Sequence, residues 1–382
     1  MNISNDALNN LIAFRKYLHK YPELSKKEYK TAKKIKEFIS GNAPDEIIEK
    51  LGGTGLAAVY SGKKPGKTVL IRADIDALPI SETNDFEHRS VFPEVGHKCG
   101  HDGHTTILAG LSAILKENPP EKGRVILLFQ PSEETGEGAD MVLKDPQFEE
   151  LKPDYVFALH NLPGYETSSI VIRDDHFAAA SKGMTAKLFG KTSHAANPEL
   201  GISPALAVAE IIQQLSSLSA SKEGFHDFKL ITVIHTRIGE IAFGTTPGYA
   251  EVRATLRSYR NDDMDMLTEK SIAIVEEASD KYGLKPEIGW QEEFPATIND
   301  EKCVQALRQV ADGNKFNVVE TEHPFRWSED FGYFTLKYPG ALFGIGSGKK
   351  HPSLHNPDYD FPDEIIPTGI RMFDGIIRKI LG

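Results

Sequence analysis

The chain has 382 residues, 40% hydrophobic and 26% charged, and 44 basic against 55 acidic residues give a net charge of −11. This length exceeds what one hydrophobic core usually organises, so we expect two domains. The acidic balance excludes nucleic acid and anionic membrane as partners, because both are bound by basic patches. No apolar run is long enough to span a bilayer, no secretory signal is evident, and cysteines are few, so we expect a cytoplasmic protein with no membrane partner.

The first half of the chain predicts an α/β domain. Residues 7–40 carry apolar side chains at helical spacing that Pro22 interrupts, which predicts two helices. Strands that alternate with helices indicate a layered α/β fold, whose sites lie beyond the strand ends. Buried-type strands are predicted at 68–72, 124–129 and 155–159, with a helix at 105–115.

The pattern changes near residue 181. Strands are predicted at 183–190, 230–236, 250–258 and 286–290, with helices at 204–217 and 262–282. This order is typical of a small ferredoxin-like α+β domain. We therefore expect one domain of residues 1–180 and 295–382, with residues 181–294 inserted into it. The returning segment predicts helices at 300–312 and 367–381 and a strand at 340–345.

The stretch from Gly96 to His104 has the highest density of potential metal ligands in the chain. It contains His97, Cys99, His101, Asp102 and His104. Such a cluster indicates a divalent metal, with a structural zinc or a redox site as alternatives. The redox alternative requires Cys99 to approach Cys303, the second of two cysteines. Within the stretch, Asp102 is expected to cap the following helix and His104 to support the loop.

Three further candidate ligands lie far from this stretch in sequence. Glu134 and His160 each follow a predicted buried strand, and His355 lies near the end of the chain. Together with Cys99 and His101 they make one thiolate, three imidazoles and one carboxylate, which exceeds the tetrahedral set of a single zinc. Two metal ions that share a ligand would use all five, which predicts a hydrolase whose metals hold and acidify a water.

Glu133 stands directly before Glu134. Adjacent carboxylates stay ionised together only beside positive charge, which metal ions supply. One carboxylate of the pair can then bind metal while the other moves a proton from the water to the leaving amine. The alternative is a solvated acidic turn, since residues 135–138 are polar or glycine.

Eight motifs, in this order, resemble the M20 metallopeptidase family. The resemblance is strongest to the amidohydrolase branch that includes hippurate hydrolases, indole-acetyl-amino-acid hydrolases and N-acetyldiaminopimelate deacetylases. The matching segments are 19–25 (HKYPELS), 72–79 (RADIDALP), 99–104 (CGHDGH), 130–134 (QPSEE), 160–163 (HNLP), 190–196 (GKTSHAA), 328–331 (SEDF) and 354–357 (LHNP).

The resemblance implies a zinc-peptidase-like catalytic domain, an α/β/α sandwich, with two divalent metal ions. It implies that Glu133 is the general base and acid, and that Asp76 orients the centre. Where this chain has Asp74, other branches of the family have a histidine. The implied metal ligands are Cys99, His101, Glu134, His160 and His355.

The resemblance also assigns roles to the inserted domain. It implies that His194 stabilises the oxyanion, often across a subunit boundary, and that the domain serves as lid and dimerisation surface. A homodimer or larger homo-oligomer is therefore expected. One departure is Gly244, which stands where the family commonly has an asparagine that contacts substrate.

The expected reaction is metal-dependent hydrolysis of the amide bond of N-acyl amino acids with an acetyl, benzoyl or similar acyl group. Zinc, manganese, cobalt and nickel all suit the ligand set. A dipeptidase or aminopeptidase is the alternative, but it needs an acidic anchor for the substrate amine that the sequence does not reveal. A non-catalytic binding protein is a further alternative, although none of the six family positions for the ligands and base is lost.

Overall fold

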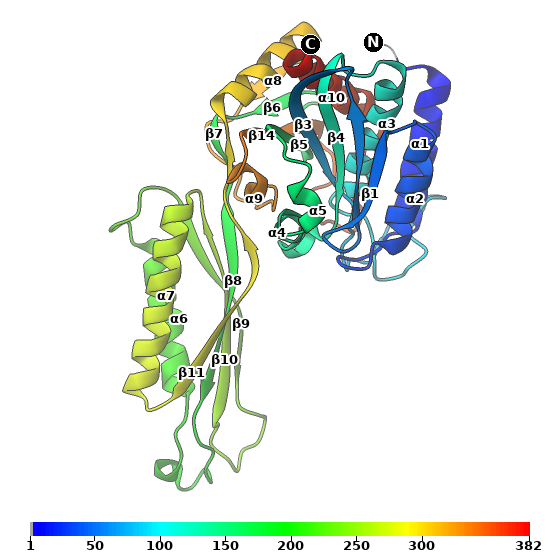
Figure 1. Ribbon diagram of the computed structural model, residues 1–382. Helices are drawn as coiled ribbons and strands as arrows, with labels where there is room; N and C mark the ends of the chain where they lie inside the picture. The colour runs from blue at the N-terminus through cyan, green and yellow to red at the C-terminus, as the bar shows by residue number, and fades with distance from the viewer. Residues whose placement is uncertain (1–2) are drawn as a thin grey trace. The chain divides into compact units, whose positions relative to one another are not determined.

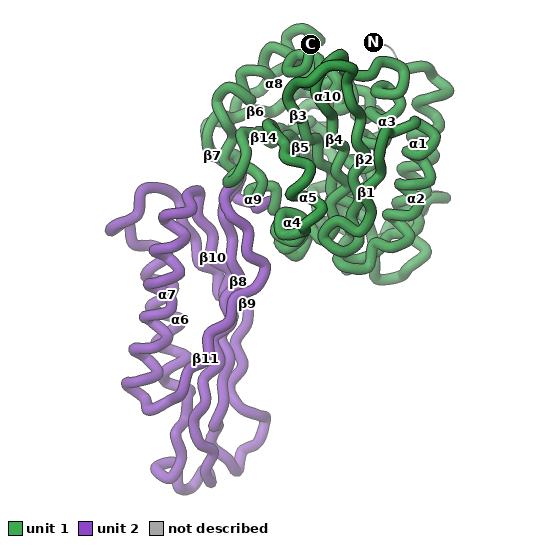
Figure 2. Tube along the Cα trace, in the orientation of Figure 1, with its two compact units in different colours: residues 1–177, 297–323, 330–382 green, residues 178–296, 324–329 purple. Residues whose placement is uncertain are grey.

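The computed structural model describes residues 3–382 (Figure 1). The chain forms two compact units (Figure 2). Unit 1 comprises the residues up to Phe177 together with 297–323 and 330–382, and unit 2 comprises residues 178–296 and 324–329. None of the helices described has the length and apolar character needed to cross a bilayer.

Unit 1 is built on an eight-stranded mixed sheet of order β1-β2-β4-β3-β5-β14-β6-β13. The central strands β4, β3, β5 and β14 run parallel, so their carboxyl ends lie at one edge of the sheet. The strands are β1 (Glu46–Leu51), β2 (Gly55–Ser61), β3 (Lys64–Asp74), β4 (Lys122–Gln130), β5 (Tyr155–Pro163), β6 (Ile170–Ile172), β13 (Val318–Glu320) and β14 (Gly340–Gly348), with β7 (Asp175–Ala178) and β12 (Thr297–Asn299) forming a separate pair.

Helices complete the layers of unit 1 (Figure 1). Alternate residues of β3, such as Val69 and Ile71, join one core with five long helices, while Leu70 between them is buried on the other face. This alternation is what a sheet covered on both faces requires. The long helices are α1 (Asn5–Lys20), α2 (Tyr29–Ser40), α3 (His101–Glu117), α8 (Glu301–Gly313) and α10 (Ile366–Leu381), and the short ones are α4 (Gly138–Leu143), α5 (Pro146–Glu149) and α9 (Gly332–Thr335).

Unit 2 contains a four-stranded antiparallel sheet of order β11-β8-β10-β9. Its helices α6 and α7 pack against each other and against the sheet. The elements follow one another as strand, helix, strand, strand, helix, strand. They are β8 (Ala180–Phe189), α6 (Ala205–Ala220), β9 (Lys229–Ile238), β10 (Tyr249–Ser258), α7 (Asn261–Lys281) and β11 (Lys285–Phe294).

The α/β fold predicted from the sequence is confirmed, but some of its elements differ. The helix expected at 105–115 begins earlier, at His101, because Gly100 adopts a left-handed conformation (φ 94°) and turns the chain into the helix. The strand β1 was not predicted. Its residues are largely exposed, so they lack the apolar alternation that signals a strand.

Candidate metal centre

The five candidate ligands gather beyond the carboxyl ends of the parallel strands of unit 1. Glu133 and Glu134 follow β4 in a single 3₁₀ turn, and His160 lies near the end of β5. Their donor atoms form overlapping groups in which every pair of ligand atoms lies within 4.8 Å. Cys99 belongs to two of these groups, one with His101 and His160 and the other with Glu134 and His355.

The imidazole of His160 is fixed in orientation. Its Nδ1 lies 2.8 Å from the carbonyl oxygen of Asn161, and its Nε2 lies 3.4 Å from Sγ of Cys99. Burial holds the pKa of His160 well below its ordinary value, so the ring is neutral. A neutral imidazole whose second nitrogen is already engaged is an oriented metal ligand.

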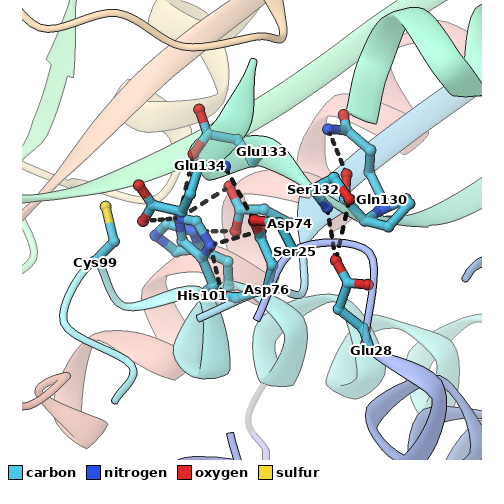
Figure 3. Close-up of polar contacts among 12 residues, drawn as sticks. Ser25, Glu28, Asp74, Asp76, Cys99, His101, Gln130, Ser132, Glu133 and Glu134 are labelled. Atoms are coloured by element: carbon cyan, nitrogen blue, oxygen red, sulfur yellow. Dashed lines mark hydrogen bonds and ion pairs between the residues drawn. The ribbon is translucent and has the colours of Figure 1, made fainter. Parts of the chain in front are cut away.

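His101 occupies the first turn of α3 and is surrounded by acids. Its Nδ1 lies 3.0 Å from the carbonyl oxygen of Asp76, which leaves Nε2 for another partner. That Nε2 lies 3.7 Å from carboxylate oxygens of Asp74, Glu133 and Glu134 (Figure 3). Burial lowers the pKa of His101, but the nearby carboxylates, Asp74 first, more than offset this and raise it to about 10. The acids thus favour a positive charge on His101 or beside its Nε2.

Glu134 lies close to His355, the fifth candidate ligand, and is bonded to Asp76. Its Oε2 lies 3.7 Å from Nε2 of His355, and its backbone N–H donates to Oδ2 of Asp76 at 3.0 Å. Burial raises the pKa of Glu134 to about 8. His355 has a left-handed backbone (φ 65°), and its N–H donates to the carbonyl oxygen of Lys98 at 2.8 Å, which ties it to the Cys99 loop.

These residues fit a pair of divalent ions. Nε2 of His101 and Oε1 of Glu134 are buried and have no hydrogen-bond partner among the residues that the structure describes. Buried polar atoms without partners are costly, so two such atoms 3.7 Å apart indicate a site for an ion. Thiolate, imidazole and carboxylate together suit zinc and its transition-metal neighbours.

Asp74 and His104 are already engaged with other side chains. Oδ1 of Asp74 lies 2.7 Å from Nδ1 of His104, whose Nε2 lies 2.6 Å from Oδ1 of Asn161. Arg72 donates to Asp74 and Asp330, both at 2.7 Å. Burial raises the pKa of Asp74, but His101, His104 and Arg72 outweigh it and hold the pKa well below its usual range. These contacts stiffen the edge of the sheet beneath the candidate ligands.

The expectation that Asp102 caps α3 is wrong. The cap position is Gly100, and Oδ2 of Asp102 instead lies 2.9 Å from Nδ1 of His19 and 3.3 Å from Nη1 of Arg15. The other nitrogen of His19 lies 2.9 Å from Oε1 of Glu82. Asp102 therefore anchors the first turn of α3, which carries His101, to α1.

Two supporting residues were missed by the sequence analysis. Oγ of Ser25 donates to Oδ2 of Asp76 at 2.7 Å, and Glu28 accepts from the backbone N–H of Ser132 at 2.8 Å. Ser25 was noted only as part of a motif. Glu28 gave no signal, because nothing in its local sequence separates it from a surface glutamate.

In unit 2, His194 is exposed, and its Nδ1 accepts from the backbone N–H of Ala196 at 3.0 Å. The segment around it pairs with the segment that contains Gly244, whose carbonyl oxygen accepts from Ala195 at 3.0 Å. A Cβ atom at Gly244 would meet no atom within 4 Å. Gly244, where the resemblance implies an asparagine, is therefore next to His194 and open.

The two cysteines do not form a disulfide. Both Cys99 and Cys303 are buried free thiols, Cys99 before α3 and Cys303 within α8. The redox alternative, which required them to approach each other, has no support in this fold.

Comparison with known proteins identifies the family. Residues 70–379 match peptidase family M20/M25/M40. The N-acetyl-L-cysteine deacetylase of Bacillus subtilis is 31% identical over 93% of this chain and 84% of its own. The N-acetyldiaminopimelate deacetylase of Exiguobacterium sibiricum is 30% identical over 96% of this chain and 98% of its own.

Solved structures agree with this result. A Bacillus subtilis protein described as a dinuclear metal-binding peptidase of family M20 superposes with a TM-score of 0.83, at 26% identity and 99% coverage of both chains. A tripeptidase from Staphylococcus aureus has a TM-score of 0.74 at 15% identity over 98% of both chains, which shows the fold alone. The predicted class, an amidohydrolase acting on linear amides, is confirmed by the named relatives. The chain belongs to peptidase family M20/M25/M40.

Proposed function

We propose that this protein hydrolyses the amide bond of N-acyl amino acids with two divalent metal ions. The observation that carries the proposal is the convergence of five donor side chains with Glu133 beside them. The proposed ligands are Cys99, His101, Glu134, His160 and His355. Bound there, the ions supply a Lewis acid for the substrate carbonyl and lower the pKa of a water.

Glu133 is the proposed general base and acid. It is buried, its Oε2 lies 3.7 Å from Nε2 of His101, and its Oε1 accepts from the backbone N–H of Asp330 at 3.4 Å. Its carboxylate therefore lies among the ligands with a fixed orientation. It accepts the proton of the attacking water and delivers it to the leaving amine.

Asp76 and His194 are assigned supporting roles. Asp76 accepts from Ser25 and Glu134 and contacts His101, so it orients two proposed ligands at once. His194 is proposed to donate a hydrogen bond to the developing oxyanion, as the family resemblance implies. Residues 181–294, which contain His194, are proposed to act as a lid and as the surface of a homodimer.

The proposed substrate class is supported by the relatives, which are named deacetylases of N-acetyl-L-cysteine and N-acetyldiaminopimelate. An acetyl, benzoyl or similar acyl group removes the charge of the substrate amine, so no acidic anchor is needed. The site does not distinguish zinc, manganese, cobalt and nickel, because all accept these donors.

A substrate panel on metal-reconstituted protein tests the proposal. Acetyl-, benzoyl- and indole-acetyl-amino acids are compared with unblocked dipeptides after loading with each of the four metals, and bound metal is counted by elemental analysis. We expect two ions per chain and hydrolysis of the acylated substrates. Faster cleavage of unblocked dipeptides would favour the peptidase alternative, and two bound ions without any hydrolysis would favour a binding protein.

A further inference from the structure

The backbone directly before the paired glutamates is in an unfavourable conformation. Ser132 has φ 56° and ψ 37°, in the left-handed region, and it is fully buried. Residues with a Cβ atom avoid this region, and they remain in it only where the surroundings determine it. Some contact must therefore hold Ser132, and through it the start of the turn Glu133–Thr135.

Glu28 makes that contact. It stands at the start of α2, but its carboxylate does not cap its own helix. Oε1 of Glu28 accepts from the backbone N–H of Ser132 at 2.8 Å and from its hydroxyl at 3.3 Å, while Oε2 accepts from Oγ1 of Thr54 at 2.7 Å. Glu28 is completely buried, so all three donors replace water around a carboxylate.

Ser25 and Lys26, which stand just before Glu28, also help to hold the backbone of the two glutamates. The backbone N–H of Lys26 donates to Oγ of Ser132 at 2.9 Å, and Ser25 donates to the Asp76 oxygen that accepts from the N–H of Glu134. Residues 25–28 thus hold Ser132 on one side and Asp76 on the other (Figure 3). The two adjacent carboxylates that follow can take separate directions because their backbone is held at both ends.

We infer that Glu28 is a positioning residue for Glu133 and Glu134, and that it acts through the left-handed conformation of Ser132. This inference rests on the proposed function of the two glutamates. The carboxylate of Glu28 bonds to Ser132 and Thr54 and not to either glutamate. Its effect on the centre is therefore indirect, through the backbone.

The first test replaces Glu28 and measures two independent quantities in the full-length protein. Glu28→Leu removes every acceptor, and Glu28→Gln keeps an amide oxygen for the N–H of Ser132. We expect Glu28→Leu to weaken zinc binding by roughly 10- to 100-fold. At saturating zinc we expect kcat to fall about 10²-fold with KM little changed, since a small displacement of a catalytic group costs this much. Glu28→Gln should recover most of both losses.

Thr31→Val provides a matched control. Thr31 lies in the first turn of α2, which Glu28 precedes, and it is buried like Glu28. The change removes its hydroxyl donor to another carboxylate, that of Glu23, at 3.0 Å and leaves the contacts of Ser132 in place. It should lower the melting temperature and leave zinc affinity and kcat unchanged. If Glu28→Leu lowered only the melting temperature as well, Glu28 would be merely structural and the inference would be wrong.

A double-mutant cycle with Ser132→Gly tests whether Glu28 acts through the backbone of Ser132. Glycine enters the left-handed region at no steric cost, so the loss from Glu28→Leu should shrink from about 100-fold to about 10-fold in the glycine background. An equal loss in both backgrounds would exclude Ser132 as the intermediary. Should Glu28→Leu not fold, Glu28→Asp, which withdraws the carboxylate by one methylene, takes its place in the cycle. A wild type that binds zinc but hydrolyses nothing would reject the proposed function, while zinc affinity alone would still decide the role of Glu28.

Discussion

Nε2 of His101 and Oε1 of Glu134 lie 3.7 Å apart, both buried and neither with a hydrogen-bond partner among the described residues. This separation is too long for a hydrogen bond and short enough for both atoms to bind one ion. The acids around His101 raise its pKa to about 10, so without metal a proton supplies the positive charge that they favour. Metal uptake should accordingly release protons.

Replacing Glu133 by glutamine separates metal binding from proton transfer. The amide keeps the size of the side chain but cannot accept a proton, so kcat should fall by roughly 10²- to 10⁴-fold. Metal content, measured by elemental analysis, should remain that of the wild type. Retained activity would remove Glu133 from the mechanism.

His194→Ala tests the contribution of unit 2. Because His194 is exposed and its ring accepts, within residues 3–382, from the N–H of Ala196 alone, the variant should fold normally. Loss of an oxyanion donor typically lowers kcat by roughly 10²- to 10³-fold. Steady-state kinetics and metal analysis check this together. A variant as active as the wild type would leave His194 with no catalytic role.

Metal removal should expose one reactive thiol. Cys99 is buried among the other proposed ligands, and a bound metal would block its sulfur. After treatment with a chelator, a thiol reagent should label one cysteine per chain. Cys303 should stay unlabelled, because burial raises the pKa of its thiol far above the ordinary value. Cys99→Ser should abolish the labelling, and equally fast labelling of the metal-loaded wild type would contradict Cys99 as a ligand.

His19 predicts a loss of stability at alkaline pH. Burial lowers its pKa, but hydrogen bonds with Asp102 and Glu82 outweigh this and raise the pKa to about 9. The unfolded-state pKa is about 6.5, so the charged ring stabilises the fold fully below pH 6.5, and this contribution is lost as the pH rises through 9. The shift corresponds to roughly 3 kcal/mol. Denaturant unfolding from about pH 6 to about pH 9.5 should show this decline in the wild type and a flatter profile in His19→Gln. Parallel profiles would contradict it.

Four of the five candidate ligands could be proposed from the residues themselves, because each of these four stands beside a local signal. Glu134 and His160 follow strands whose apolar runs are recognisable, and Cys99 and His101 stand in a dense cluster. The strand order of the sheet then brings them together, since β4, which precedes Glu134, and β5, which contains His160, are both parallel neighbours of β3.

The residues that hold the candidate ligands in place were harder to predict. His19 and Asp102 are 83 residues apart and Glu28 and Ser132 are 104 apart, and neither pair carries a pattern that links its members. The left-handed backbone of Ser132 could likewise not be predicted from the sequence, because serine does not usually signal that conformation as glycine does. The role of Asp102 was predicted wrongly, because a carboxylate in a first helical turn resembles a cap until its buried partner is known.

The family match begins at residue 70, yet Arg15, His19, Ser25 and Glu28 all precede it and bond to residues of the centre or its supports. The matched stretch, residues 70–379, is thus shorter than the stretch whose side chains hold the centre in place. A fragment trimmed to the matched boundary would keep every proposed ligand but leave Asp102, Asp76 and Ser132 with lost partners. Engineers who shorten this enzyme, or graft its centre onto another scaffold, need to carry the first thirty residues with it.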